Sequence, residues 1–119
     1  MDAVEILLAA KDKVMDGWCT GHRAEDAEGR YMGLDDNPAE YLQGWDPRAV
    51  KWCLMGAIEG AQGCFDKPMS LSVTRFLRSR GYSGYINFND GTGCSKERTI
   101  GMLDEMIMYA KDHPDLVIK

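Results

Sequence analysis

Apolar residues recur at helical spacing in the N-terminal stretch and again after residue 70. Between Val4 and Met15 they share one face of a helix, with Asp2 placed as its N-cap and Gly17 as its stop. The second stretch follows Ser70, which is placed to cap it, and ends at Gly81. Both patterns predict amphipathic helices that turn one face toward a core.

The clearest helix signal lies between Pro47 and Ala61. Asp46 stands as an N-cap, proline is well tolerated at the first helical position, and small or apolar residues cover nearly every side. We therefore expect this helix at the centre of the fold. Gly56 and Gly60 each lower helix stability by about 0.8–1.0 kcal/mol relative to alanine, so we expect a neighbouring element, for instance one with an aromatic ring, to approach closely there.

The C-terminal third predicts a short strand and a last helix. Residues 85–88 alternate between apolar and polar and lead into a turn. The last helix contains residues 100–110, is capped by Ser95, or by Thr92 if it begins earlier, and ends at His113-Pro114. The sum is a mainly helical α+β fold of four helices, in which a buried central helix is surrounded by the other three beside a short two-stranded β element.

A chain of 119 residues, 45% of them hydrophobic, suits a single domain over residues 1–119, with 114–119 as a tail. Residues 18–46 break the helical pattern and predict a long loop or a hairpin insertion. Between Glu25 and Asp46, seven acidic residues are opposed by Arg30 alone, so this acidic loop outweighs the net charge of −5. Such a charge run is either solvated surface or a docking element.

The excess of acidic residues limits the classes of partner that the protein can bind. A net charge of −5 has the wrong sign for unaided contact with phosphate backbones, so we expect no direct nucleic-acid binding. No apolar run approaches the roughly 20 residues that span a bilayer, and the acidic N-terminus is unlike a signal peptide. We expect no membrane contact, a cytoplasmic location and four reduced cysteines without a structural disulfide.

Cys19 and His22 place two metal-binding side chains in one short segment, and Cys64 and Cys94 could complete a tetrahedral set. Those two cysteines stand alone, without the paired spacing of zinc knuckles. Free cysteines often act as small buried hydrophobic residues instead. The sequence therefore predicts no metal and no cofactor.

A cysteine nucleophile is the alternative to a binding role. Cys19 lies close to His22 in the sequence, and Asn89 or Asp90 could orient the imidazole of a small enzyme whose substrate is unknown. Cys53 is expected two turns inside the central helix, where an apolar environment keeps its thiol neutral. We favour a non-catalytic role. Four cysteines and two histidines make such a combination easy to find in the sequence by chance.

Methionines cover more than one face of the last helix. Met102 and Met108 fall away from the predicted core stripe, and methionine forms adaptable binding surfaces. This face predicts an interface, including a homodimer seam.

Short motifs along most of the chain carry a resemblance to a known family. They are Gly17-Trp18-Cys19, Gly29-Arg30, the central segment Trp52-Cys53-Leu54-Met55-Gly56-Ala57-Ile58, Asn89-Asp90 and Arg98-Thr99. In these motifs the chain resembles a family of small uncharacterised proteins of bacteria and their phages. Phe88 stands where that family has tryptophan, and the acidic loop is longer.

This resemblance implies a context rather than a mechanism, because the family has no assigned activity. It implies an accessory protein of a phage or mobile element that contacts a host protein in the host cytoplasm. By analogy alone, an acidic surface could inhibit a nucleic-acid-handling defence complex, as anti-CRISPR proteins do.

The sequence thus favours a small acidic non-catalytic protein-binding module. Its acidic loop is expected to dock on a basic surface of a host protein, with exposed aromatic residues as anchors. The predicted contact residues are Asp35, Asp36, Glu40, Tyr31, Tyr41 and Trp45.

Overall fold

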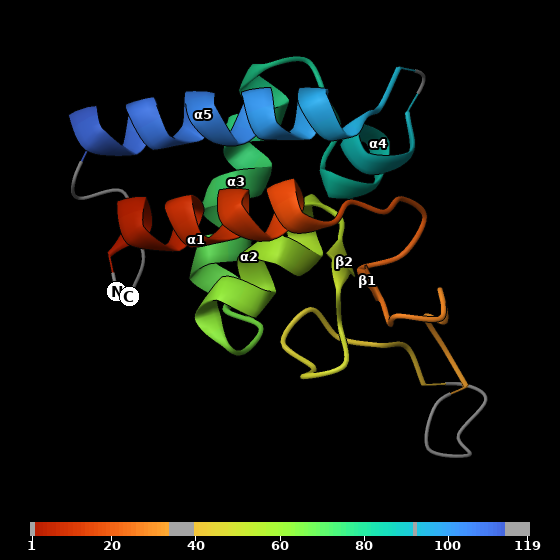
Figure 1. Ribbon diagram of the computed structural model, residues 1–119. Coiled ribbons are helices and arrows are strands. Elements are labelled where there is room, and N and C mark those ends of the chain that lie inside the picture. The colour runs from red at the N-terminus through yellow and green to blue at the C-terminus, as the bar shows by residue number, and fades with distance from the viewer. Residues whose placement is uncertain (1, 34–39, 92, 114–119) are drawn as a thin grey trace.

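Two long helices, one near each end of the chain, lie side by side and run in opposite directions (Figure 1). The computed structural model describes residues 2–33, 40–91 and 93–113. Helix α1, Ala3–Asp16, has the predicted N-cap: the Asp2 carboxylate accepts a hydrogen bond from the Glu5 amide, and the Glu5 side chain accepts one in return. Helix α5, Lys96–Asp112, begins at the predicted Ser95 cap. Both end helices are therefore confirmed.

The central helix α2, Leu54–Gln62, is buried as expected but shorter than predicted. Its predicted start at Pro47 is wrong, because the Asp46 carboxylate accepts hydrogen bonds from the Arg48 amide and guanidinium and forms a turn instead. The chain then extends, and Cys53 caps α2 through its sulfur, 3.4 Å from the Gly56 nitrogen. Cys53 thus lies at the helix start, not two turns inside.

The β element lies elsewhere than predicted. Strand β1, Ala24–Glu25, comes from the 18–46 segment and pairs antiparallel with β2, Lys51–Trp52. The predicted strand at 85–88 is wrong, since Tyr85–Asp90 form helix α4. Tyr85, Phe88 and Asn89 are buried at helical spacing, whereas Ile86 is 77% exposed. Four alternating residues were too few to distinguish the period of a strand, about 2 residues, from that of a helix, about 3.6 residues.

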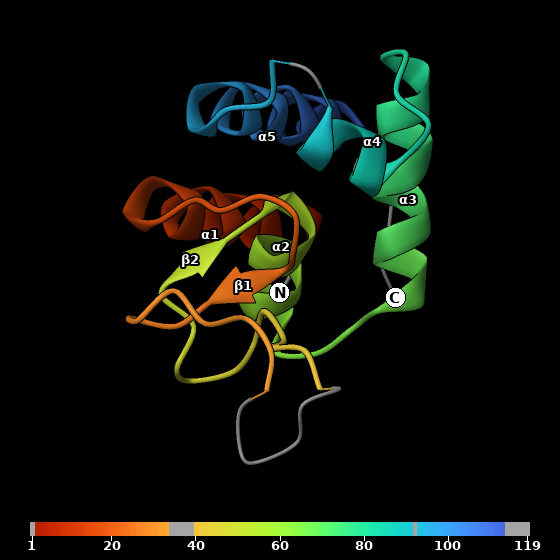
Figure 2. The ribbon, with the colours of Figure 1, turned by 90° about the vertical axis from the view of Figure 1, so that its right-hand side faces the viewer.

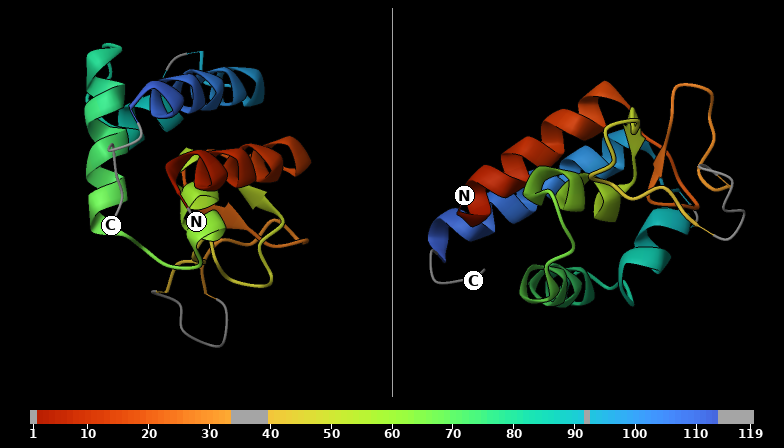
Figure 3. Two further views of the ribbon diagram at one scale, coloured as in Figure 1. Left: turned by 90° about the vertical axis from the view of Figure 1, so that its left-hand side faces the viewer. Right: turned by 90° about the horizontal axis from the view of Figure 1, so that it is seen from below.

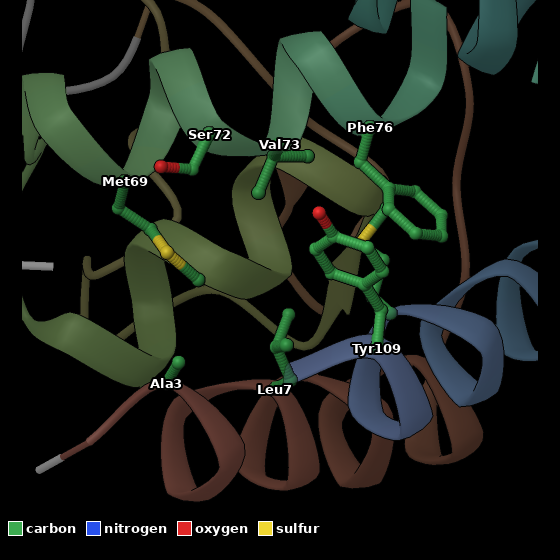
Figure 4. Close-up of a pocket in the computed structure, with 8 residues that line it drawn as sticks. Ala3, Leu7, Met69, Ser72, Val73, Phe76 and Tyr109 are labelled. Carbon is green, nitrogen blue, oxygen red and sulfur yellow. The ribbon is translucent and has the colours of Figure 1, made fainter. Parts of the chain in front are cut away.

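Helix α3, Lys67–Ser79, runs across α1 and α5 (Figures 2 and 3). It begins before the predicted Ser70 cap, because the Asp66 carboxylate already accepts a hydrogen bond from the Met69 amide. Where the three helices meet, Leu7, Val73 and Tyr109 help to line an apolar pocket of about 20 Å³ (Figure 4). This space is close to that of one water molecule, so the pocket is a packing gap rather than a ligand site.

Glycines bring the loop that precedes β2, and the segment around Arg23, against α2. A Cβ atom on Gly56 would lie 1.9 Å from the backbone carbonyl oxygen of Arg23, and one on Gly44 would lie 2.0 Å from that of Gly56. The expected close approach at Gly56 and Gly60 is confirmed, but backbone rather than an aromatic ring fills it: a Cβ on Gly60 would meet the Gly44 carbonyl at 2.6 Å.

The described residues form one mostly helical domain with five helices and a two-stranded sheet, which confirms the predicted fold class and adds one helix. The core combines apolar faces of α1, α2 and α5, including Leu7, Ala10, Val14, Leu54, Ala57, Ile58, Leu103, Met106 and Ile107. Met102 also lies in it, so its predicted place outside the core stripe is wrong. No helix in the described ranges is both long and apolar enough to span a membrane.

Candidate functional site

The segment from Gly17 to Glu25 is held against β2 and its neighbours by backbone hydrogen bonds. Trp52 donates to the Gly17 carbonyl at 3.0 Å and accepts from the Cys19 amide at 3.2 Å. The Cys53 amide donates to the Arg23 carbonyl at 3.0 Å. The chain thereby curls around Trp52, which fixes the positions of the side chains between residues 19 and 25.

Cys19, His22 and Glu25 come together in this segment and form a group that we call the Cys19 cluster. One ligand atom from each lies within 4.8 Å of the other two. His22 Nε2 contacts Glu25 Oε2, and the Cys19 thiol points to the His22 carbonyl oxygen at 3.8 Å. Cys19 is buried, and the other two side chains are largely covered. The cluster is therefore a compact S, N and O donor set.

The Cys19 thiol is protonated in this environment. Burial raises its pKa to about 12, and the nearby Cys53 and Glu25 act in the same direction. A thiol nucleophile needs the opposite shift. The cluster as it stands therefore lacks the thiolate that covalent catalysis by Cys19 would require.

Asn89 lies near the cluster but serves the fold. Its side-chain oxygen accepts a hydrogen bond from the Leu54 amide at 3.3 Å, which satisfies an otherwise unpaired donor at the start of α2. The neighbouring Asp90 accepts from the Gly21 amide at 2.9 Å and the Thr20 hydroxyl at 3.1 Å. The turn at the end of α4 thus positions the 20–21 segment, and Asn89 has a partner other than His22.

Two hollows adjoin the segment that carries His22. A cleft of about 180 Å³ separates it from the start of α2 and from α4, with Cys53, Tyr85 and Asn89 among its lining residues. A more open hollow of about 590 Å³ lies beside Glu40, Tyr41 and Gln43. Residues 21–23 line both, so this segment divides two solvent-accessible depressions.

Three rings form an aromatic stack at the edge of the open hollow. The rings of His22 and Tyr31 are 4.0 Å apart and nearly parallel, and those of Tyr31 and Tyr41 are 6.3 Å apart. A hydrogen bond from the Leu42 amide to the Tyr31 carbonyl holds the two segments together. Tyr31 is 37% exposed and Tyr41 54% exposed. The predicted anchor Trp45 is also partly exposed, although no ring contact joins it to the stack within the described residues.

The acidic loop is partly neutralised from within. The Asp26 carboxylate accepts hydrogen bonds from the Glu28 and Arg30 amides and pairs with the Arg30 guanidinium at 2.9 Å, and these contacts lower its pKa. Arg48 lowers the pKa of Asp46 in the same way. Glu40 lines the open hollow. Asp35 and Asp36 lie outside the described residues.

The remaining candidates are dispersed. Within the described residues, neither Cys64, which is exposed, nor Cys94, at the start of α5, joins the Cys19 cluster. On α5, Met108 is 68% exposed, but with Met102 buried the apolar face available for a homodimer seam is smaller than expected. Glu25 was not predicted as a member of the cluster. Its signal was the repeated three-residue step from Cys19 to His22 to Glu25.

Glu59 of α2 was not predicted as a candidate either, because a glutamate in a helix is usually exposed to solvent. It is only 3% exposed, and neither carboxylate oxygen has a hydrogen-bond partner among the described residues. The nearest cation is Arg23, whose Nη1 lies 3.8 Å from Oε2. Burial raises the pKa of Glu59, and Arg23 offsets the rise only in part.

A Glu59→Gln substitution is expected to stabilise the protein at pH 7 by about 1 kcal/mol, because it removes a buried charge that lacks hydrogen bonds. The raised pKa means that the folded state binds this proton more readily than the unfolded state. The penalty is therefore absent below the ordinary glutamate pKa and grows as pH rises through the raised value. Urea unfolding of both proteins from pH 4 to pH 8 measures it. A wild type more stable than the variant at pH 7 would show that the Arg23 pair outweighs burial.

Comparison with known proteins places the chain in one family. Residues 1–108 match the model of a family of unknown function, DUF6197, and the chain belongs to that family. No curated protein matches the sequence. No solved structure matches it either.

Proposed function

We propose that this protein is a small non-catalytic protein-binding module that contacts its partner through the aromatic stack. The observation that carries the proposal is the exposure of Tyr31 and Tyr41, which are held in a fixed stack at the edge of an open hollow. Tyrosines fixed in this way lose little conformational entropy on binding, and each presents a large apolar surface with a polar end. Such residues are common anchors of interfaces.

The chemistry around the stack supports binding over covalent catalysis. Burial keeps the Cys19 thiol protonated, and the Asn89 side chain is used by the start of α2. The stack and the adjacent hollow need no reactive group in order to accept a protruding side chain of a partner. A role as a small enzyme using Cys19 and His22 is therefore the weaker proposal.

The partner that we propose is a protein with a basic surface. Glu40 lies beside Tyr41 in the lining of the hollow, and the net charge of the chain is −5. Asp35 and Asp36, between the two tyrosines in sequence, add to this proposal. Arg30 and Arg48 compensate part of the loop's negative charge, so we assign affinity mainly to the aromatic stack and assign association rate and salt dependence to the carboxylates. An origin in bacteria or their phages, a host protein as partner and a cytoplasmic location belong to the same proposal.

A double substitution of Tyr31 and Tyr41 by alanine is expected to weaken partner capture by about tenfold or more, because each removes an anchor. The matched control is the Leu71→Ala and Met108→Ala double variant, which removes two exposed apolar side chains from α3 and α5. Tagged proteins are incubated with bacterial lysates, washed at increasing salt concentration, and their bound proteins are quantified by mass spectrometry.

The informative partner is one captured by the wild type and the control but lost from the tyrosine variant. Release of that partner at high salt would support the basic-surface assignment. A partner retained equally by the tyrosine variant, or lost only from the control, would contradict the assignment of the binding surface.

A further inference from the structure

The Cys19 cluster has the composition and dimensions of a metal site. Tetrahedral zinc with sulfur, nitrogen and oxygen ligands at 2.0–2.3 Å places those ligand atoms about 3.3–3.8 Å from one another. In the Cys19 cluster the three atoms already lie within 4.8 Å. The spread of the three atoms is therefore close to that of a coordinated set, and the contacting atoms of His22 and Glu25 would separate to admit the ion.

Backbone contacts restrain the cluster where a metal ion would need it. The segment that carries all three side chains is tied to Trp52 and Cys53 by hydrogen bonds on both sides of His22. The ring of His22 is further held by its stack on Tyr31. Restraint of this kind lowers the entropy that the ligands lose on metal binding.

The three donors are chemically selective. A thiolate excludes Mg²⁺ and Ca²⁺, which prefer oxygen ligands, whereas a mixed sulfur, imidazole and carboxylate set suits Zn²⁺. We infer that Cys19, His22 and Glu25 form a zinc-binding site with three protein ligands. The fourth position is left to water or to a group from a bound partner.

Burial and access are both compatible with this site. The ion's charge compensates the thiolate that forms when zinc displaces the Cys19 proton. His22 lines both hollows, so they give the ion a route from solvent. The contact between His22 and Glu25 also has a simpler reading as an ion pair without metal, and the experiment distinguishes the two.

The test is metal binding by the full chain, purified with a chelator and titrated with Zn²⁺ against a chromophoric competitor. We expect one zinc per chain. Glu25→Gln, Cys19→Ser and His22→Gln each remove a direct ligand and are expected to weaken binding by about 100-fold or more, since loss of an outer-shell partner alone costs about 10- to 100-fold. The controls Cys64→Ser and His113→Gln keep wild-type affinity, because both residues lie outside the cluster. Cobalt substitution gives a second readout: a thiolate-to-cobalt absorption band that disappears in Cys19→Ser.

Two results would overturn the site: no zinc binding by the wild type, or wild-type affinity in Cys19→Ser. Glu25→Gln guards against loss of fold, because glutamine keeps the size and shape of the glutamate side chain, which is 18% exposed. Its circular dichroism and its melting temperature without zinc should match those of the wild type, whereas zinc should raise only the wild-type melting temperature. Metal binding is measured without a partner protein, so its failure and a failure of the proposed binding function are distinguishable.

Discussion

Replacing Trp52 with alanine is expected to lower the free energy of unfolding by about 3–5 kcal/mol, a large share of the roughly 5–15 kcal/mol typical of a domain. The indole is buried, and its N–H donates to the Gly44 carbonyl oxygen at 3.0 Å. The Lys13 ammonium group lies 4.8 Å from the ring centroid. One side chain thus joins β2 to the loop that follows the aromatic stack and to α1. Urea unfolding followed by circular dichroism measures the loss.

The matched variant for this position is Trp52→Phe. It keeps an aromatic ring in the core but removes the N–H donor, so we expect a loss of about 1–2 kcal/mol. The difference between the two variants separates ring packing from the hydrogen bond to Gly44. Equal losses in both would contradict the assignment of most of the effect to packing.

A Gly56→Ala substitution is expected to destabilise the protein by roughly 3 kcal/mol or more, although alanine favours helices. The added Cβ would lie 1.9 Å from the Arg23 carbonyl oxygen. That oxygen belongs to backbone and accepts the Cys53 amide hydrogen bond, so it cannot move aside as a flexible side chain would. The segment that carries the Cys19 cluster has to shift instead. Thermal unfolding would show a fall in melting temperature of about 10 °C or more.

Gly101→Ala is the control for this prediction, because it makes the same chemical change inside α5. Beyond its chain neighbours and the backbone of its own helix, no described atom would lie within 4 Å of a Cβ on Gly101, so the helix preference of alanine acts alone. We expect stabilisation by about 0.8–1.0 kcal/mol. The two substitutions should therefore shift the melting temperature in opposite directions. A stabilising Gly56→Ala would contradict the close approach of the Arg23 backbone.

Helix starts could be predicted from the sequence where short-range contacts decide the structure. The caps at Asp2 and Ser95 act on amides three residues away, so the starts of α1 and α5 could be predicted from their own residues. Asp46 was also predicted as an N-cap, but no helix begins there. The Arg48 side chain engages its carboxylate, and the following residues pair with Ala24–Glu25, far back in the chain. A cap signal alone could not reveal that competition.

The candidate site also has features that local sequence predicts and features that depend on distant contacts. The proximity of Cys19 and His22 followed from their spacing, and Glu25 could have been added from the same step along the chain. The role of Asn89 at the start of α2 could not be predicted, because it depends on a contact across 35 residues. The burial of Glu59 likewise depends on how α2 is enclosed by segments distant in sequence. Local motifs therefore indicated the cluster, and tertiary packing determined its surroundings.

The side-by-side arrangement of α1 and α5 bears on how the chain folds during synthesis (Figure 1). The apolar face of α1 packs on α2 and on α5, which leaves the ribosome after the other described helices. Until α5 emerges, part of that face has no native neighbour, and closing so long a loop slows folding relative to a bundle of sequential helices. The nascent chain therefore completes this core only after α5 has emerged, and in the interval it depends on α2 to shield α1.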